Sequence, residues 1–140
     1  MSPATVRYIV DDVDAALAFY CGELGFQELM HPGPGFAMLA RDDLRLALNA
    51  VGGPGGASQA MPDGRVPTPG GWNRIQIQVT NIEDTVASLR SSGTSFRNDI
   101  VSGLGGKQVL AEDPSGNVVE LFEPAASPPP SAPAQSLSSS

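Results

Sequence analysis

An internal duplication constrains this sequence more than any other feature. The segment Val10–Tyr20 returns sixty-nine residues later as Val79–Leu89, and each copy follows a run of alternating apolar and polar residues. Such alternation is typical of a strand with one buried face, and the segment after it has helical periodicity. A chain built from two similar units usually has its binding site between them, so we expect both copies to contribute to the site.

Each copy is predicted to form a βαβββ unit. Asp12 and Asn81 are expected to cap the two helices, and Gly25 and Gly93 to end them. Turn signals rich in Pro, Gly, Asp and Asn separate the remaining segments. The expected strands are residues 5–10, 26–31, 35–41 and 44–49 in the first copy, and 73–79, 94–98, 107–112 and 117–123 in the second.

The predicted fold class is α+β, with one domain over residues 1–123. Its two tandem units cover about residues 4–49 and 72–123. The connecting stretch 50–71 is rich in Gly and Pro, so it is either a linker or a lid over a ligand. The Pro-, Ser- and Ala-rich stretch 124–140 has little apolar surface to bury and is expected to be a disordered tail.

Composition narrows the class of partner. Eight basic and fifteen acidic residues give a net charge of −7, which opposes nucleic-acid binding and suits either a cationic ligand or plain solubility. No apolar run approaches the ~20 residues of a membrane span, and the N-terminus does not resemble a signal peptide. The single cysteine, Cys21, has no internal disulfide partner. We therefore expect a cytoplasmic protein without membrane or nucleic-acid partners.

Strand alternation predicts which side chains face a ligand. In the second copy the apolar Ile75, Ile77 and Val79 share one face and are expected to pack on the helix, which leaves Arg74, Gln76 and Gln78 on the opposite, concave face. The same offset places Arg7 on the concave side of the first copy. On the last strand, one face carries Val118, Glu120 and Phe122. Charged and amide groups are costly to bury without partners, so this face suits a ligand cavity.

Two motifs carry a family resemblance. The first copy reads Ala-Leu-Ala-Phe-Tyr up to Tyr20 and then Leu-Gly-Phe at 24–26, and the second ends Asp-Pro-Ser-Gly-Asn-Val-Val-Glu-Leu at 113–121. Together they resemble the vicinal oxygen chelate (VOC) superfamily, which includes glyoxalase I, extradiol dioxygenases, fosfomycin-inactivating enzymes and bleomycin-resistance proteins. The resemblance covers nearly all of residues 5–124. It implies a curled mixed sheet around a small-molecule cavity, very often in a homodimer, with the units paired either within one chain or across two.

The resemblance also implies where a metal centre would lie in the enzymatic members. The two ligand positions at the starts of the units hold Thr5 and Arg74. A threonine hydroxyl is a weak ligand, and an arginine has no lone pair to donate. Glu120 matches the commonest remaining ligand, but residues 44–48 offer no carboxylate for the fourth. We therefore predict no metal and no other cofactor, with a divalent ion such as Zn, Mn or Fe as the alternative.

The predicted ligand-binding residues are Arg7, Trp72, Arg74, Gln76, Glu120 and Phe122. Glu120 is also the one candidate catalytic residue, as a general base. An ion pair with Arg74 in place of a metal is an equal alternative to the direct role of Glu120 in ligand binding. Trp72 either stacks on a ligand or packs in a core or dimer contact. The only histidine, His31, is read as a turn residue, with proton transfer as the alternative.

The function predicted from these residues is metal-free binding of an aromatic or cationic small molecule. By resemblance to the bleomycin-resistance branch, the chain would sequester a drug or natural product and thereby give antibiotic resistance. The alternative is a lyase, isomerase or dioxygenase of the glyoxalase type, working with a metal or by acid–base chemistry. The sequence leaves open the identity of the compound, whether any reaction occurs, and the roles of the 50–71 stretch and the tail.

Overall fold

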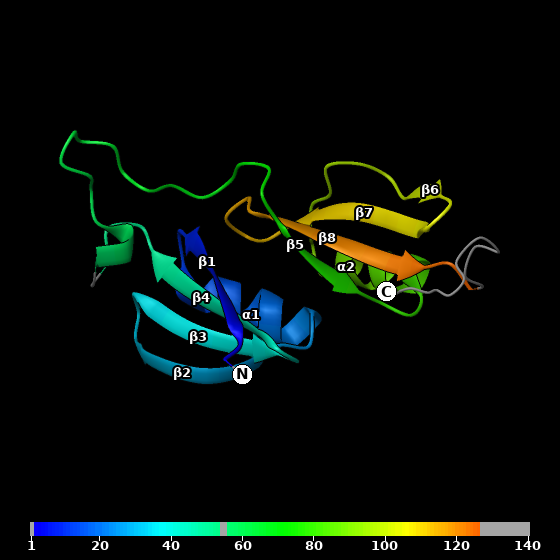
Figure 1. Ribbon diagram of the computed structural model, residues 1–140, viewed down its shortest axis with the longest axis horizontal. Helices are drawn as coiled ribbons and strands as arrows, with labels where there is room; N and C mark the ends of the chain where they lie inside the picture. The colour runs from blue at the N-terminus through cyan, green and yellow to red at the C-terminus, as the bar shows by residue number, and fades with distance from the viewer. Residues whose placement is uncertain (1, 54–55, 127–140) are drawn as a thin grey trace. The chain divides into compact units, whose positions relative to one another are not determined.

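The computed structural model describes residues 2–53 and 56–126, and the chain divides into two compact units (Figure 1). Among the described residues, the first unit comprises 2–53, 56–75 and 112–118, and the second comprises 76–111 and 119–126. Of the predicted tail, residues 127–140 lie outside the described residues. No helix in the described ranges is both long and apolar enough to cross a membrane.

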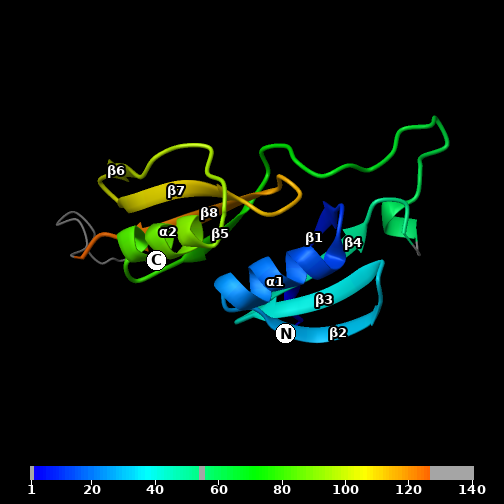
Figure 2. The same ribbon diagram turned by 180° about the vertical axis from the view of Figure 1, so that it is seen from behind.

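The first unit holds one helix and a four-stranded sheet. Its elements are β1 (Ala4–Val10), α1 (Val13–Glu23), β2 (Gln27–Gly33), β3 (Phe36–Arg41) and β4 (Leu44–Ala50). The strands lie in the order β1-β4-β3-β2, with β1 parallel to β4 and the other two pairs antiparallel. Helix α1 covers one face of this sheet, as Figure 2 shows. A short 3₁₀ helix, Gly56–Ser58, follows in the connecting stretch.

The second unit repeats this order. Its elements are β5 (Ile75–Gln78), α2 (Ile82–Ser91), β6 (Val101–Gly103), β7 (Gly106–Glu112) and β8 (Val118–Pro124), in the sheet order β5-β8-β7-β6. Figure 1 shows β5 and β8 running in the same direction, as β1 and β4 do. The α+β prediction with two tandem βαβββ units is therefore confirmed.

Both helices begin and end where the sequence signals place them. The carboxylate of Asp12 accepts from the Ala15 N–H at 3.2 Å, and the amide oxygen of Asn81 accepts from the Asp84 N–H at 3.2 Å. Each bond satisfies an N–H that would otherwise have no partner at a helix start. Beyond the helix ends, Gly25 and Gly93 have φ of 76° and 90°, a left-handed backbone that glycine adopts without strain.

One predicted strand is wrong. Residues 94–98 form no strand; within them only Phe96 makes an isolated bridge, with Ala111, and the strand at this position of the unit is β6 at Val101–Gly103. The reason is local. The side-chain oxygen of Asn98 accepts from the Leu110 N–H at 2.9 Å, so a side chain takes the place that a backbone carbonyl would have in a continuous ladder.

Apolar side chains lie between each helix and its sheet. In the first unit Tyr20 of α1 is fully buried and meets the rings of Tyr8, Phe19 and Phe26 edge to face, with centroids 5.0–6.4 Å apart. In the second unit the fully or nearly buried side chains are Ile77, Ile82, Leu89, Val109, Ala111, Val119 and Leu121. The predicted alternation in β5 is confirmed, because Ile75 and Ile77 are buried and Gln76 and Gln78 are exposed.

The turn between β7 and β8 packs within the first unit. The Tyr20 hydroxyl donates to Asp113 Oδ2 at 2.9 Å, and Asn117 Nδ2 donates to the Ile9 carbonyl at 2.8 Å. The Tyr8 hydroxyl donates to the Val118 carbonyl at 2.8 Å and accepts from the Ile75 N–H at 2.9 Å. Burial raises the pKa of both phenols, and the Asp113 charge raises them further. The two tyrosines therefore hold the beginnings of β5 and β8.

Candidate functional site

The open face of the second sheet, the side away from α2, holds a buried carboxylate. Gln76 Nε2 on β5 donates to Glu120 Oε2 on β8 at 2.7 Å. Only 8% of Glu120 is exposed. Both residues were predicted to bind a ligand, and strand alternation explains why they meet: β5 and β8 are neighbours, and both side chains project from the same side. A hydrogen bond to an ionised acceptor is stronger than one between neutral groups, so it fixes the carboxylate in place.

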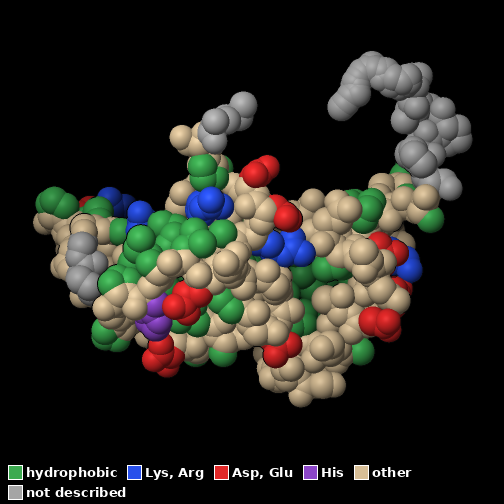
Figure 3. Space-filling view, turned by 90° about the horizontal axis from the view of Figure 1, so that it is seen from below, with side chains coloured by type: hydrophobic (Ala, Val, Ile, Leu, Met, Phe, Trp, Pro, Cys, Tyr) green, Lys and Arg blue, Asp and Glu red, His purple; other side chains and the backbone are tan. Residues whose placement is uncertain are grey.

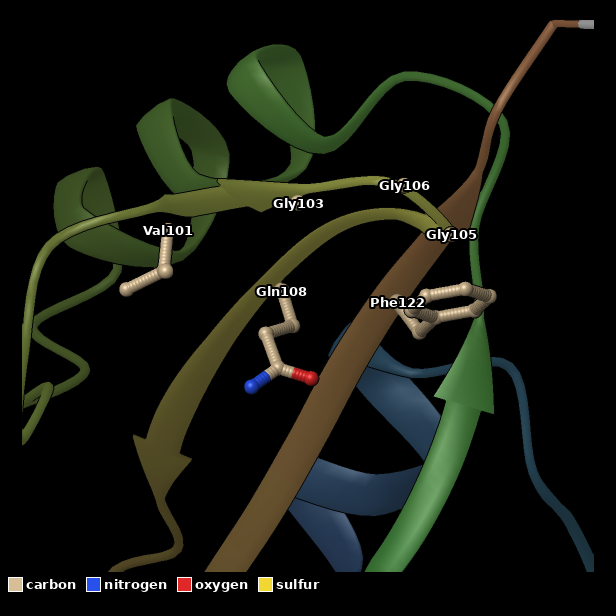
Figure 4. Close-up of a pocket in the computed structure, with 6 residues that line it drawn as sticks. All are labelled: Val101, Gly103, Gly105, Gly106, Gln108 and Phe122. Atoms are coloured by element: carbon tan, nitrogen blue, oxygen red, sulfur yellow. The ribbon is translucent and has the colours of Figure 1, made fainter. Parts of the chain in front are cut away.

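A pocket of about 230 Å³ lies on this unit beside the end of β8. It is lined by Val101, Gly103, Gly105, Gly106, Gln108 and Phe122. Figure 4 shows the Gln108 amide and the Phe122 ring projecting from the neighbouring strands β7 and β8. Phe122 is the third predicted ligand-binding residue on this unit, after Gln76 and Glu120. Its ring forms an aromatic wall of the pocket, with the Gln108 amide beside it.

Glycine in the β6–β7 hairpin lets the backbone approach β8 closely. Gly106 has φ of 143°, and a Cβ placed on it would lie 2.1 Å from the Glu123 carbonyl oxygen. The approach is completed by a backbone hydrogen bond of 3.0 Å from the Ala125 N–H to the Gly105 carbonyl. Residue 125 therefore still pairs with the hairpin, and β8 runs to Pro124, one residue beyond the predicted strand. The glycines of this hairpin, Gly103, Gly105 and Gly106, line one part of the pocket.

Arg7 lies in the first unit and is held by a residue that sequence reasoning missed. Arg7 Nη1 on β1 donates to Asn49 Oδ1 on β4. Asn49 is 3% exposed, although it lies in a strand that reads as an apolar run. The register explains the contact, because β1 and β4 are parallel neighbours and Ile9 pairs with Asn49. The available signal for Asn49 was a single amide within the otherwise apolar run 46–50.

Trp72 and Arg74 lie in the segment that leads into β5. Trp72 is 67% exposed, and its carbonyl accepts a long hydrogen bond of 3.5 Å from Arg74 Nη1. The Arg74 charge also acts on the Tyr8 phenol, where it partly offsets the rise in pKa that burial causes. The ion pair between Arg74 and Glu120 stays a prediction, as do the roles of Trp72 and Arg74 in ligand binding.

The donor set on the described residues does not fit the metal centre that the resemblance implies. Thr5 is an exposed residue at the start of β1, and Arg74 holds the equivalent place before β5. Across the described ranges, no three His, Cys, Asp or Glu side chains gather closely enough to hold an ion. A site with one carboxylate and no imidazole lacks the ligands that Zn²⁺ normally takes. We derive no chemical step through a metal, and the absence of a cofactor stays a prediction.

His31 lies within β2, and is not the turn residue that we expected. Its Nε2 is 3.6 Å from Asp14 Oδ1 on α1. Figure 3 shows this histidine in purple, beside acidic side chains and close to exposed hydrophobic ones. The contact joins β2 to the start of α1, and the alternative of proton transfer by His31 stays a prediction.

Gln108 and the hairpin glycines complete the residues that sequence reasoning missed. The prediction of a strand at 94–98 placed the neighbour of β7 in the wrong segment, so the side chains on β6 were not considered. Gln108 alternates with the buried Val109, and this alternation was the available signal for its open-face position.

A family model matches most of the chain. The model is the Glyoxalase/Bleomycin resistance protein/Dioxygenase superfamily, and the match covers residues 3–121. No curated protein matches the sequence.

Solved structures share this fold. A member of the same superfamily from Sphaerobacter thermophilus is 25% identical with a TM-score of 0.68, over 88% of this chain and 97% of that one. TnmS3, an antibiotic binding protein from Streptomyces sp. CB03234, is 22% identical with a TM-score of 0.66, over 89% and 97%. Lactoylglutathione lyase from Agrobacterium tumefaciens is 20% identical with a TM-score of 0.66, over 85% and 90%. The last two likenesses show the fold alone.

Proposed function

We propose that this chain, which belongs to the Glyoxalase/Bleomycin resistance protein/Dioxygenase superfamily, binds a small molecule on the open face of its second sheet without a resident metal. The observation that carries the proposal is the buried Glu120 carboxylate, held by Gln76 at 2.7 Å on the same unit as the Phe122 pocket. A fixed negative group close to an aromatic wall suits a ligand with a cationic or hydrogen-bond-donating group and a planar body.

The fold alone does not separate binding from catalysis. Members of one superfamily use the same scaffold for unrelated reactions, so the argument depends on the side chains. Thr5 and Arg74 stand where the resemblance would place metal ligands, and neither side chain supplies a good donor. The antibiotic binding protein from Streptomyces gives a precedent for a binding role on this scaffold. We extend the proposal to sequestration of a drug or natural product, by a cytoplasmic homodimer.

A catalytic role is the second candidate function. The likeness to the lactoylglutathione lyase and the buried carboxylate favour it, because a carboxylate that is largely removed from water is able to act as a general base. In that case Glu120 would take a proton from the substrate, and a divalent ion would be sought by native mass spectrometry of protein purified without chelator. One bound ion per subunit would favour this candidate over metal-free binding.

The test of the binding proposal uses an aromatic cation of defined structure. Native mass spectrometry first shows whether the purified protein carries a small molecule. Calorimetry then measures the affinity for 2-naphthylmethylammonium in the wild type and in Glu120→Gln, which keeps the shape of the side chain and removes its charge. We expect a loss of about tenfold or more from removing a charge-assisted contact. Glu28→Gln, at an exposed carboxylate on β2, is the matched control and should leave the affinity unchanged. Equal affinity in Glu120→Gln and wild type would remove Glu120 from the site.

A further inference from the structure

The open face of the first sheet is positively charged. Tyr8 of β1 contacts Tyr20 of α1, so the alternating residue Arg7 points away from the helix. Register places Arg45 of β4 on the same side, since it pairs with Thr5, two residues before Arg7. The hydrogen-bond partners of the two guanidinium groups are the neutral Asn49 amide and the Asp42 carbonyl at 3.4 Å. Neither acceptor is negatively charged, so these contacts do not neutralise the two positive charges on this face.

Asn49 holds hydrogen-bonding capacity that the described protein does not use. Asn49 is only 3% exposed, and the one hydrogen-bond partner of its side chain in residues 2–53 and 56–126 is Arg7, which donates to Oδ1. The amide nitrogen is left with two N–H donors and no described acceptor. A buried donor without an acceptor costs about 1–3 kcal/mol, so such groups are normally satisfied. The Asn49 amide nitrogen therefore lacks a hydrogen-bond acceptor. The positive charge of the adjacent Arg7 favours an acceptor that is negatively charged.

Apolar side chains of β2 and β3 lie next to Asn49 on this face. Phe36 pairs with Asn49, and Met38 pairs with Ala47 and with Met30 of β2. Phe36 and Met38 are half-buried, and Met30 is 54% exposed. Methionine and aromatic side chains make favourable contacts with flat rings, and a guanidinium group stacks on them as well. The face thus combines an apolar platform with a cationic, donor-rich edge.

We propose that this face, defined by Arg7, Asn49, Phe36 and Met38, binds the carboxylate of an aromatic acid. Arg7 and the Asn49 amide nitrogen donate to the carboxylate oxygens, and the ring of the acid lies on Phe36 and Met38. This inference rests on the proposed function, because it assumes that the chain binds small molecules. It adds a substrate class with a negative group, whereas the open face of the second sheet favours a positive one.

The experiment compares three naphthalene probes that differ only in the attached group. Calorimetry at low salt measures 2-naphthoate, 2-naphthamide and 2-naphthylmethylammonium against the full chain. We expect wild type to bind the naphthoate about tenfold tighter than the amide, because Arg7 makes a charge-assisted contact only with the carboxylate. Arg7→Gln should remove that preference. Asn49→Asp, which keeps the shape of the side chain and neutralises Arg7, should remove it as well.

The control is Arg65→Gln, which changes an exposed arginine in the connecting stretch that pairs with Asp63 at 2.8 Å. Arg65→Gln and Arg7→Gln have the same net charge. A difference between their affinities for the naphthoate therefore reports a local contact at Arg7 and not the loss of one positive charge from the protein. The naphthoate preference should persist in this variant. Circular dichroism of each variant shows whether the fold is kept, and Asn49→Asp tests the proposal independently if Arg7→Gln does not fold.

The outcomes separate this inference from the proposed function. Equal affinity of wild type for naphthoate and naphthamide, or an equal loss in Arg7→Gln and Arg65→Gln, would overturn the carboxylate subsite. If wild type still binds 2-naphthylmethylammonium and Glu120→Gln does not, the proposed function stands and only the carboxylate subsite is overturned. If none of the three probes binds, both proposals fail for this class of ligand.

Discussion

In each unit a side-chain hydrogen bond joins the first strand to the last, but the charged residue is the donor in the first unit and the acceptor in the second. In the first unit Arg7 donates to the neutral amide of Asn49. In the second, Gln76 is the residue at the matching place in the repeat, and its neutral amide donates to the Glu120 carboxylate. The open face of the first sheet therefore carries a cationic group, and that of the second carries an anionic group. The two copies keep one scaffold, but the side chains in these two hydrogen bonds give the two sheets different charges.

The largest expected difference between the units concerns their hairpin glycines. Gly106→Ala should lower the free energy of unfolding by about 3 kcal/mol, because the new Cβ would meet the Glu123 carbonyl oxygen at 2.1 Å and φ is 143°. Gly33, at the end of β2, has no neighbour within 4 Å of such a Cβ, and Gly33→Ala is the control. Urea denaturation measures both. Similar losses in the two variants would show that the close approach is not specific to the second hairpin.

The next effect concerns the turns before the last strands. The first unit uses the short turn at Asp42, whereas the turn before β8 includes Asp113, 4% exposed, whose oxygens accept from Tyr20, Ser115 and Asn117 at 2.9–3.0 Å. Asp113→Ala should cost about 3 kcal/mol, because it leaves buried donors without an acceptor. Asp99→Ala, at a fully exposed carboxylate, should change stability by less than about 0.5 kcal/mol. A small loss in Asp113→Ala would mean that water replaces the carboxylate.

Removing the donor of each cross-strand pair tests the comparison directly. Gln76→Ala should cost about 2 kcal/mol, because it takes a hydrogen bond from the buried charge of Glu120. Arg7→Ala should cost less, about 1 kcal/mol or below, because the residue is exposed and its acceptor is neutral. The urea midpoints of the two variants measure the difference. A larger loss in Arg7→Ala would reverse our assignment of which pair carries the stability.

The smallest effect concerns the ion pair at the start of α2. Lys107 Nζ lies 2.7 Å from Glu83 Oε2, and this hydrogen bond lowers the pKa of Glu83 and raises that of Lys107. In the first unit the contact at the start of α1 joins Asp14 to His31 at 3.6 Å. Because the Glu83 pKa is lowered from 4.5, its contribution is present above that pH and is lost as the pH falls through the folded-state pKa.

Lys107→Met checks this by thermal unfolding. The melting temperature should fall by no more than about 2 °C near neutral pH, as expected of an exposed pair. The difference from wild type should disappear in acid, below the folded-state pKa of Glu83, and at high salt, which screens exposed charges. A difference that persisted in strong acid would mean that the lysine stem acts through packing and not through its charge.

Local patterns predicted most of the fold. The caps at Asp12 and Asn81 and the alternation in β5 lie within a few residues of sequence, and all were confirmed. The strand expected at 94–98 failed because the Asn98 side chain competes with the backbone for the Leu110 N–H, which a periodicity of apolar residues does not register.

The candidate sites were predictable only in part for a similar reason. Gln76, Glu120 and Phe122 were found because alternation fixes which side of a strand a residue faces. Asn49 was missed because its partner, Arg7, is 42 residues away and the strand around it is apolar. Gln108 lies on a strand that was predicted in the right place, but the pocket that it lines also needs β6, and β6 was assigned to the wrong segment. Contacts between distant segments follow from topology, and topology was known only in outline.

The two buried tyrosines have a consequence for the order in which the chain is made. Tyr8 and Tyr20 find their hydrogen-bond partners at Val118 and Asp113, which lie 110 and 93 residues later. A ribosome adds residues one at a time, so the first unit cannot complete its core until the β7–β8 turn has left the exit tunnel. The first unit is therefore the first to be made and the last to complete the hydrogen bonds of its core.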